Sequence, residues 1–295
     1  MLGPNFLEGQ APRTAEDPKE IQLPEDSVDG VTLLARFTHC LPTAHNQIES
    51  FADIAKMLTG LGVVADKYDC IHAVSMASES IMHRCMNNIP LDTSQILPKD
   101  TLYAYARLAA AAYSLDMTFE FAFFTRRLVL DTTASFTEVA DIEGCEGLPQ
   151  SAIMGLEEQR TAVREALVST IAEGACGKCW CNQLAVRTVY QSELARLLDL
   201  PHWPPPWTRY RLASVLRELC AIETLTIGGT LACGHPRSPI SERLTFAQLK
   251  KRCEIVSNMA HGLCLPCARQ DKWQSRCEHA KLRKPVPLKD PFMQG

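Results

Sequence analysis

The sequence predicts a mainly α-helical protein with a partial α+β part at its N-terminus. The helical expectation rests on apolar residues that recur every three or four positions, most clearly over 151–173. That stripe consists of Ile153, Leu156, Val163, Leu167 and Ile171. The α+β expectation rests on 19–26, where Ile21 and Leu23 alternate with polar residues as in a short strand. One strand near the start of a helical chain is therefore expected.

Helical spacing predicts eight helices in chain order. Their expected ranges are 27–40, 48–64, 71–86, 101–115, 117–130, 151–173, 211–223 and 245–258. The segments 87–100 and 132–150 contain proline or glycine and are expected to be loops. The proline-rich segment 201–210 predicts a rigid elbow between helices.

Composition and charge restrict the classes of function. The 295 residues are 46% hydrophobic and 22% charged, which is sufficient for a core in one or two domains. A formal net charge of −4 gives no electrostatic reason for general nucleic-acid binding. The sequence shows neither an apolar run of membrane-spanning length nor a secretory signal peptide. We therefore expect an intracellular protein, cytoplasmic or nuclear, that makes no membrane contact.

The thirteen cysteines supply the main candidate site. In a reducing compartment they are expected to be buried thiols or metal ligands instead of disulfides. Cys176 with Cys179, and Cys264 with Cys267, have the Cys-x-x-Cys spacing that places two thiolates on one turn. The two pairs together predict a four-ligand structural zinc site.

Such a site would join distant parts of the chain, so the helices 151–173 and 245–258 should end at a common point. The substitute ligands, should one of the four point away, are Cys233, His235 and His261. Cys277 and His279 form a weaker pair. Unligated thiols are the alternative, whereas a redox dithiol would need a βαβ context that the sequence lacks.

Signatures of common enzymes are absent from the sequence. There is no phosphate-binding GxxxxGK[ST] or GxGxxG motif, no GxSxG and no HExxH. The histidines His39, His72 and His83 lie singly on expected helices and are interpreted as ordinary core or surface residues. We therefore expect no catalytic residue and predict that the protein is not an enzyme.

Three segments carry a resemblance to a known family. They are MLGPNFLEG at 1–9, LPEDSVDGVTLLARFTH at 23–39 and ADKYDC at 65–70. Their order of strand, helix, helix, turn and helix resembles the C-terminal half of a BTB/POZ domain, in the variant found in filamentous fungi. The resemblance covers 1–90 and extends more loosely to about residue 270. It implies an interaction protein that dimerises or links substrates to a cullin-type ubiquitin ligase.

The resemblance also implies that the chain begins inside the BTB fold, without its first hairpin and its main dimerisation helix. Either the gene model is truncated or the protein uses half of the fold. The missing helix should leave apolar surface uncovered on 27–40 and 48–64, which would favour self-association or a covering partner.

Four regions follow from these interpretations. They are a partial BTB/POZ-like domain at 1–90, a helical extension at 101–173, a Cys/His-containing helical region at 174–280 and a flexible, basic, proline-containing tail at 281–295. The predicted function is that of a protein–protein adaptor. A zinc-stabilised, transcription-associated regulator and a nonfunctional truncated remnant are the alternatives.

Overall fold

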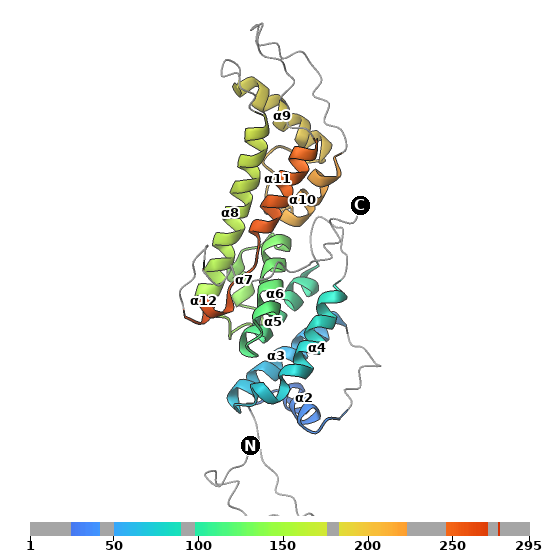
Figure 1. Ribbon diagram of the computed structural model, residues 1–295, viewed down its shortest axis with the longest axis vertical. Coiled ribbons are helices and arrows are strands. Elements are labelled where there is room, and N and C mark those ends of the chain that lie inside the picture. The colour runs from blue at the N-terminus through green and yellow to red at the C-terminus, as the bar shows by residue number, and fades with distance from the viewer. Residues whose placement is uncertain are drawn as a thin grey trace, which may run out of the picture.

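The computed structural model describes residues 25–41, 50–89, 98–175, 183–222, 246–270 and 277 (Figure 1). These residues form eleven helices and no strand. The helices are α2 (Val28–Thr38), α3 (Phe51–Lys67), α4 (Ile71–Asn87), α5 (Lys99–Ser114), α6 (Thr118–Asp131), α7 (Phe136–Ala140), α8 (Gln150–Ala175), α9 (Gln183–Leu197), α10 (Leu212–Ala221), α11 (Phe246–Met259) and α12 (Leu265–Arg269).

The mainly α-helical expectation is confirmed, and the eight predicted helices are present with similar bounds. The expected strand falls almost entirely outside the described residues, so the BTB-like α+β part is not shown. Three helices were not predicted from the sequence. Helices α7 and α12 have five residues each, too few for a periodic pattern, and α9 has no clear apolar stripe. None of the described helices is both long and apolar enough to cross a bilayer.

Helices α2 and α3 cross at two glycines, and their backbones are closest at this point. A Cβ atom added to Gly30 would lie 2.4 Å from the carbonyl oxygen of Gly60, so the two backbones are in direct contact there. Beside this crossing, Asp26 accepts hydrogen bonds from Lys67 Nζ at 2.7 Å and from Tyr68 Oη at 2.6 Å. The start of α2 is thereby fixed to the end of α3.

Helix α5 covers the apolar face of α3. Its alanine-rich sequence, including the fully buried Ala109 and Ala111, allows a close approach between the two helices. Leu58 and Leu61 of α3 have no exposed surface, and Leu34 of α2 has 2%. Much of the apolar surface that was expected to be uncovered on these two helices is therefore buried, by α5 and by the α2–α3 contact, although Val28 and Val63 remain exposed.

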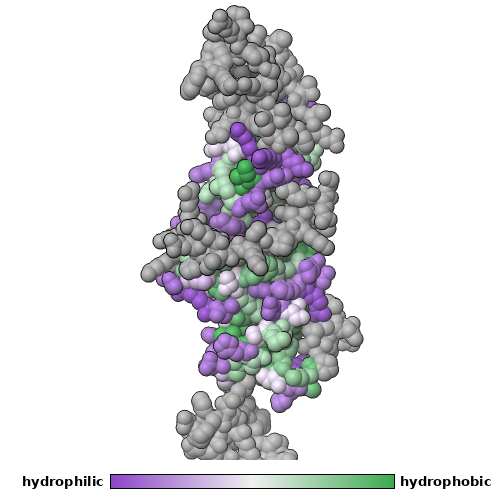
Figure 2. Space-filling view, viewed as in Figure 1, coloured by the Kyte–Doolittle hydropathy of each residue, from purple (hydrophilic) through white to green (hydrophobic). Residues whose placement is uncertain are grey.

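Some large apolar residues in this part of the chain do reach the surface. Val28, Val63 and Met76 lie on three different helices. On the face drawn in Figure 2, green hydrophobic residues lie among purple hydrophilic ones. Single exposed apolar residues of this kind are common on folded proteins.

Helix α8 is the longest described element and runs along one side of the molecule (Figure 1). Its 26 residues correspond to about 39 Å at a rise of 1.5 Å per residue. Helix α11 packs beside it in the opposite direction, so the C-terminal end of α11 lies near the N-terminal half of α8 (Figure 1). The expectation that these two helices end at a common point is wrong for this reason.

Helix α6 lies between α5 and the helices that follow it in the chain. It contacts α5 on one side and α8, α10 and α12 on the other. Its last residue, Asp131, is buried and forms ion pairs with Arg127 at 3.0 Å and with Arg211 at 3.7 Å. The second of these pairs joins α6 to the residue that precedes α10.

Candidate metal centre

The segment between α11 and α12 is fixed to α6 by hydrogen bonds to its backbone. The Arg126 Nε–H donates to the carbonyl oxygen of Ala260 at 2.6 Å. The Leu263 N–H donates to the hydroxyl of Thr125 at 2.8 Å, and this hydroxyl itself donates to the Phe121 carbonyl at 2.6 Å. All of these contacts lie immediately before the first cysteine of the site.

Gly262 makes this close contact with α6 sterically possible. Its φ of +77° lies in the left-handed region, which side chains other than glycine rarely adopt. A Cβ atom at this position would lie 1.8 Å from the carbonyl oxygen of Ala122. The chain can therefore approach α6 this closely only with glycine at this position.

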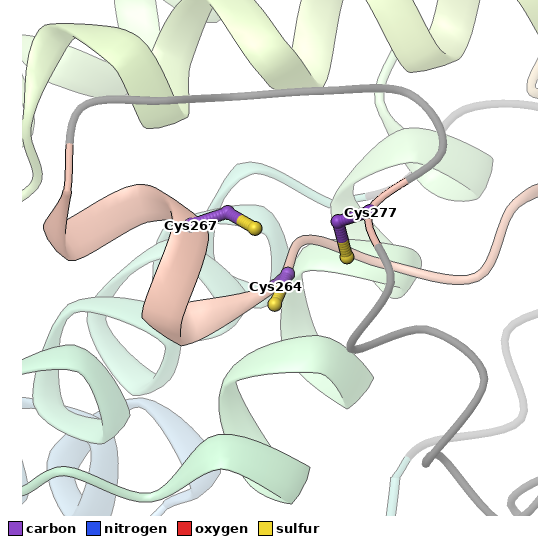
Figure 3. Close-up of side chains that lie close together, drawn as sticks. All are labelled: Cys264, Cys267 and Cys277. Atoms are coloured by element: carbon purple, nitrogen blue, oxygen red, sulfur yellow. The ribbon is translucent and has the colours of Figure 1, made fainter.

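Three cysteines meet directly after this segment (Figure 3). Cys264 is the N-cap residue of α12, and Pro266 lies in the first turn, where its fixed φ suits a helix start. The Ala268 N–H donates to the Cys264 carbonyl at 2.9 Å, which closes a turn that brings Cys267 beside Cys264. Cys277 lies further along the chain, and its sulfur faces the other two (Figure 3).

The three sulfur atoms all lie within 4.8 Å of one another. Tetrahedral coordination with Zn–S bonds of about 2.3 Å requires sulfur–sulfur separations of roughly 3.8 Å, so small side-chain shifts would suffice. Cys264 and Cys267 are buried, and Cys277 is half-buried. The cluster could hold a metal ion such as zinc.

Burial and the adjacent thiols of Cys264 and Cys277 raise the pKa of Cys267 to about 12. A metal ion would therefore displace a proton from this thiol on binding. Burial also raises the pKa of Cys85 to about 11 and that of Cys145 to about 12, although neither belongs to the cluster. The convergence of three thiols, more than burial, is thus what distinguishes this site.

The structure brings together two of the predicted ligands, Cys264 and Cys267. Cys277, which the sequence indicated only as part of a weaker pair, is the third member of the cluster. Its spacing carries no Cys-x-x-Cys signal, and only the folded structure places it beside the other two cysteines. The other two predicted ligands, Cys176 and Cys179, lie outside the described residues.

None of the three substitute ligands is found at the cluster in the described part of the chain. Cys233 and His235 lie outside these residues. The His261 ring instead has its Nδ1 atom 3.2 Å from Gln159 Nε2 and 2.8 Å from the Gly262 carbonyl oxygen. His261 therefore belongs to the contact between α8 and the segment that joins α11 to α12.

No protein-family model, no curated protein and no solved structure matches this chain. The resemblance of 1–90 to BTB/POZ proteins, and the functions that it implies, therefore remain predictions.

Proposed function

We propose that this chain is a helical protein-interaction adaptor whose C-terminal part is stabilised by a structural zinc ion at Cys264, Cys267 and Cys277. The observation that carries the proposal is the convergence of three thiols within 4.8 Å in a largely buried position. Structural zinc sites are closed and rich in thiolates, whereas catalytic sites keep a position open to substrate. The donor set and its burial favour the structural role.

A metal at this position would explain how so short an element as α12 is held in place. Five residues form little more than one turn, which is far too short to be stable by itself. A bound ion would join α12 to the chain around Cys277. Through Gly262 and Leu263, it would also reinforce the contact with α6.

The interaction role rests on a different support, the resemblance of 1–90 to BTB/POZ proteins. By that resemblance, the helices α2, α3 and α4 would present the surface for self-association or for a cullin-type scaffold. The packing of α2 and α5 against α3 supports a folded element that could present such a surface.

The zinc part of the proposal is tested by elemental analysis of the purified full chain. We expect one zinc ion per chain, and loss of that ion in each of Cys264→Ser, Cys267→Ser and Cys277→Ser. Cys145→Ser is the matched control, because this thiol is also buried but lies outside the cluster and should leave the zinc content unchanged. Wild-type protein without stoichiometric zinc would contradict the proposal.

Two further variants address the predicted four-ligand set. If Cys176→Ser and Cys179→Ser both retain the zinc ion, the ion is held without these two residues. If either variant loses it, a residue beyond the three-cysteine cluster is needed to hold the ion.

The interaction part is tested by analytical ultracentrifugation of the full chain, alone and with purified cullin N-terminal domains. We expect either a dimer or a defined complex. A monomer that binds none of these domains would contradict the BTB-type adaptor role and would leave the zinc result unaffected.

A further inference from the structure

Three potential metal ligands meet where α4 faces the start of α6, apart from the cysteine cluster. Glu79 and His83 lie one turn apart on α4, and Glu120 lies in the first turn of α6. The spacing of four residues places Glu79 and His83 on one face of their helix. Glu120 completes the group from a part of the chain remote in sequence.

The geometry of the group is compact. His83 Nε2 lies 3.0 Å from Glu120 Oε1, and one ligand atom from each of the three residues lies within 4.8 Å of the others. The imidazole also packs edge-on against the ring of Phe119, with 6.1 Å between centroids, which restricts its orientation. One nitrogen and two carboxylate oxygens therefore face a common point.

The burial of Glu120 makes a cation at this point favourable. This residue is only 4% exposed, and a buried carboxylate is costly unless a positive charge compensates it. Glu79 brings a second carboxylate close to the first, and the two anions repel each other. Either a protonated His83 or a metal ion bound by all three residues could supply the compensating charge.

We propose that Glu79, His83 and Glu120 form a second metal site that binds a divalent transition-metal ion, with Zn²⁺ as the preferred ion. One imidazole with two carboxylates is a donor set typical of zinc, whereas Mg²⁺ and Ca²⁺ favour oxygen donors alone. Three protein ligands leave at least one coordination position of a tetrahedral ion open. Glu79 and His83 are exposed, so this position faces solvent.

This site differs in kind from the cysteine cluster. The cluster offers soft thiolates in a largely buried position, and the second site offers harder donors at the surface. The two are therefore separable by the probe ion and by the variant. The second site does not depend on the adaptor role or on the cysteine cluster.

The test is a calorimetric titration of the zinc-loaded full chain with further Zn²⁺. We expect binding of one additional equivalent, weakened at least about tenfold in Glu79→Gln and in His83→Ala. His72→Ala and Glu165→Gln are the control variants. His72 is exposed on α4 and Glu165 is exposed on α8, and both lie outside the group, so both variants should bind the additional ion as the wild type does. The two ligand variants affect exposed side chains, so they should remain folded.

A second titration uses Co²⁺, whose absorption spectrum distinguishes thiolate ligands from nitrogen and oxygen ligands. We expect only weak visible bands and no sulfur-to-cobalt charge transfer for the additional ion. A charge-transfer band would assign the ion to cysteines and overturn the proposal. The absence of an additional equivalent would also overturn it and would leave only the direct contact between His83 and Glu120.

Discussion

The helices α2–α5 and the helices from α6 onward are held together by different physical means. Among the described residues, the first part buries mainly apolar side chains, and its polar exceptions are Thr59, Ser78 and the side chain of Asp26. The second part also buries charged side chains, namely Glu120, Arg126, Asp131, Arg160 and Arg211. Apolar packing is non-directional, whereas buried charges and thiols require particular partners. The two parts should therefore respond differently to substitution.

The largest expected effect is the loss of Asp131 in the second part. This carboxylate lies between Arg127 and Arg211, and Asp131→Ala would remove it from the buried guanidinium of Arg211 and the partly buried one of Arg127. Removal of one partner from a buried ion pair typically costs about 3–5 kcal/mol. We expect a loss of that size in the free energy of unfolding measured with urea.

Glu193→Ala is the control for this substitution. Glu193 forms an ion pair with Arg196 at 2.7 Å, but on the exposed surface of α9. Solvent screening should make its removal nearly silent. Equal losses from the two variants would show that burial does not set the strength of charge pairing in this protein.

A somewhat smaller effect is expected from Leu61→Ala in the first part. Leu61 is fully buried on α3, and truncation of such a residue typically costs about 2–5 kcal/mol. Val63→Ala on the same helix is the control, because Val63 is 57% exposed and should have little effect. A Leu61→Ala variant as stable as the wild type in urea unfolding would mean that α2–α5 do not form a tightly packed layer.

The smallest expected effect concerns Glu157 and depends on pH. Partial burial alone would raise the pKa of this carboxyl, but hydrogen bonds from the Phe136 N–H and from Arg160 outweigh it and lower the pKa below its ordinary value. A lowered pKa in the folded state stabilises the fold above the unfolded-state pKa of about 4.3, and this contribution is lost as pH falls through the folded pKa.

Glu157→Gln should therefore be slightly less stable than the wild type at pH 7. The difference should disappear as the pH is lowered toward 3. Urea midpoints measured across this range test the prediction, with the exposed neighbour Glu158→Gln as the control. A difference in stability that does not change with pH would show that the shape of the Glu157 side chain, and not its charge, causes the effect.

The helices of both parts could largely be predicted from the sequence because an amphipathic stripe is a local signal. The stripe of α8 and the alanine-rich run of α5 each identify their helix without knowledge of the fold. The cover that α5 provides for α3 could not be predicted, since it depends on how elements pack. For this reason less apolar surface is uncovered on α2 and α3 than was expected.

The candidate site, like the fold, could be predicted from the sequence only in part. Cys264 and Cys267 were identified because two intervening residues place them about one turn apart, whereas only the folded structure places Cys277 beside them. Glu120 likewise meets His83 from another helix, so His83 looked solitary in the sequence. Local spacing identified two of the three clustered cysteines, and tertiary packing added the third.

The contact between Gly262 and Ala122 has a consequence for the comparison of sequences. A methyl group at position 262 would overlap a carbonyl oxygen of α6. Any related protein that keeps this architecture is therefore expected to keep glycine two residues before the first cysteine. Within the pattern Gly-x-Cys-x-x-Cys at 262–267, the glycine is thus required by the backbone contact with α6.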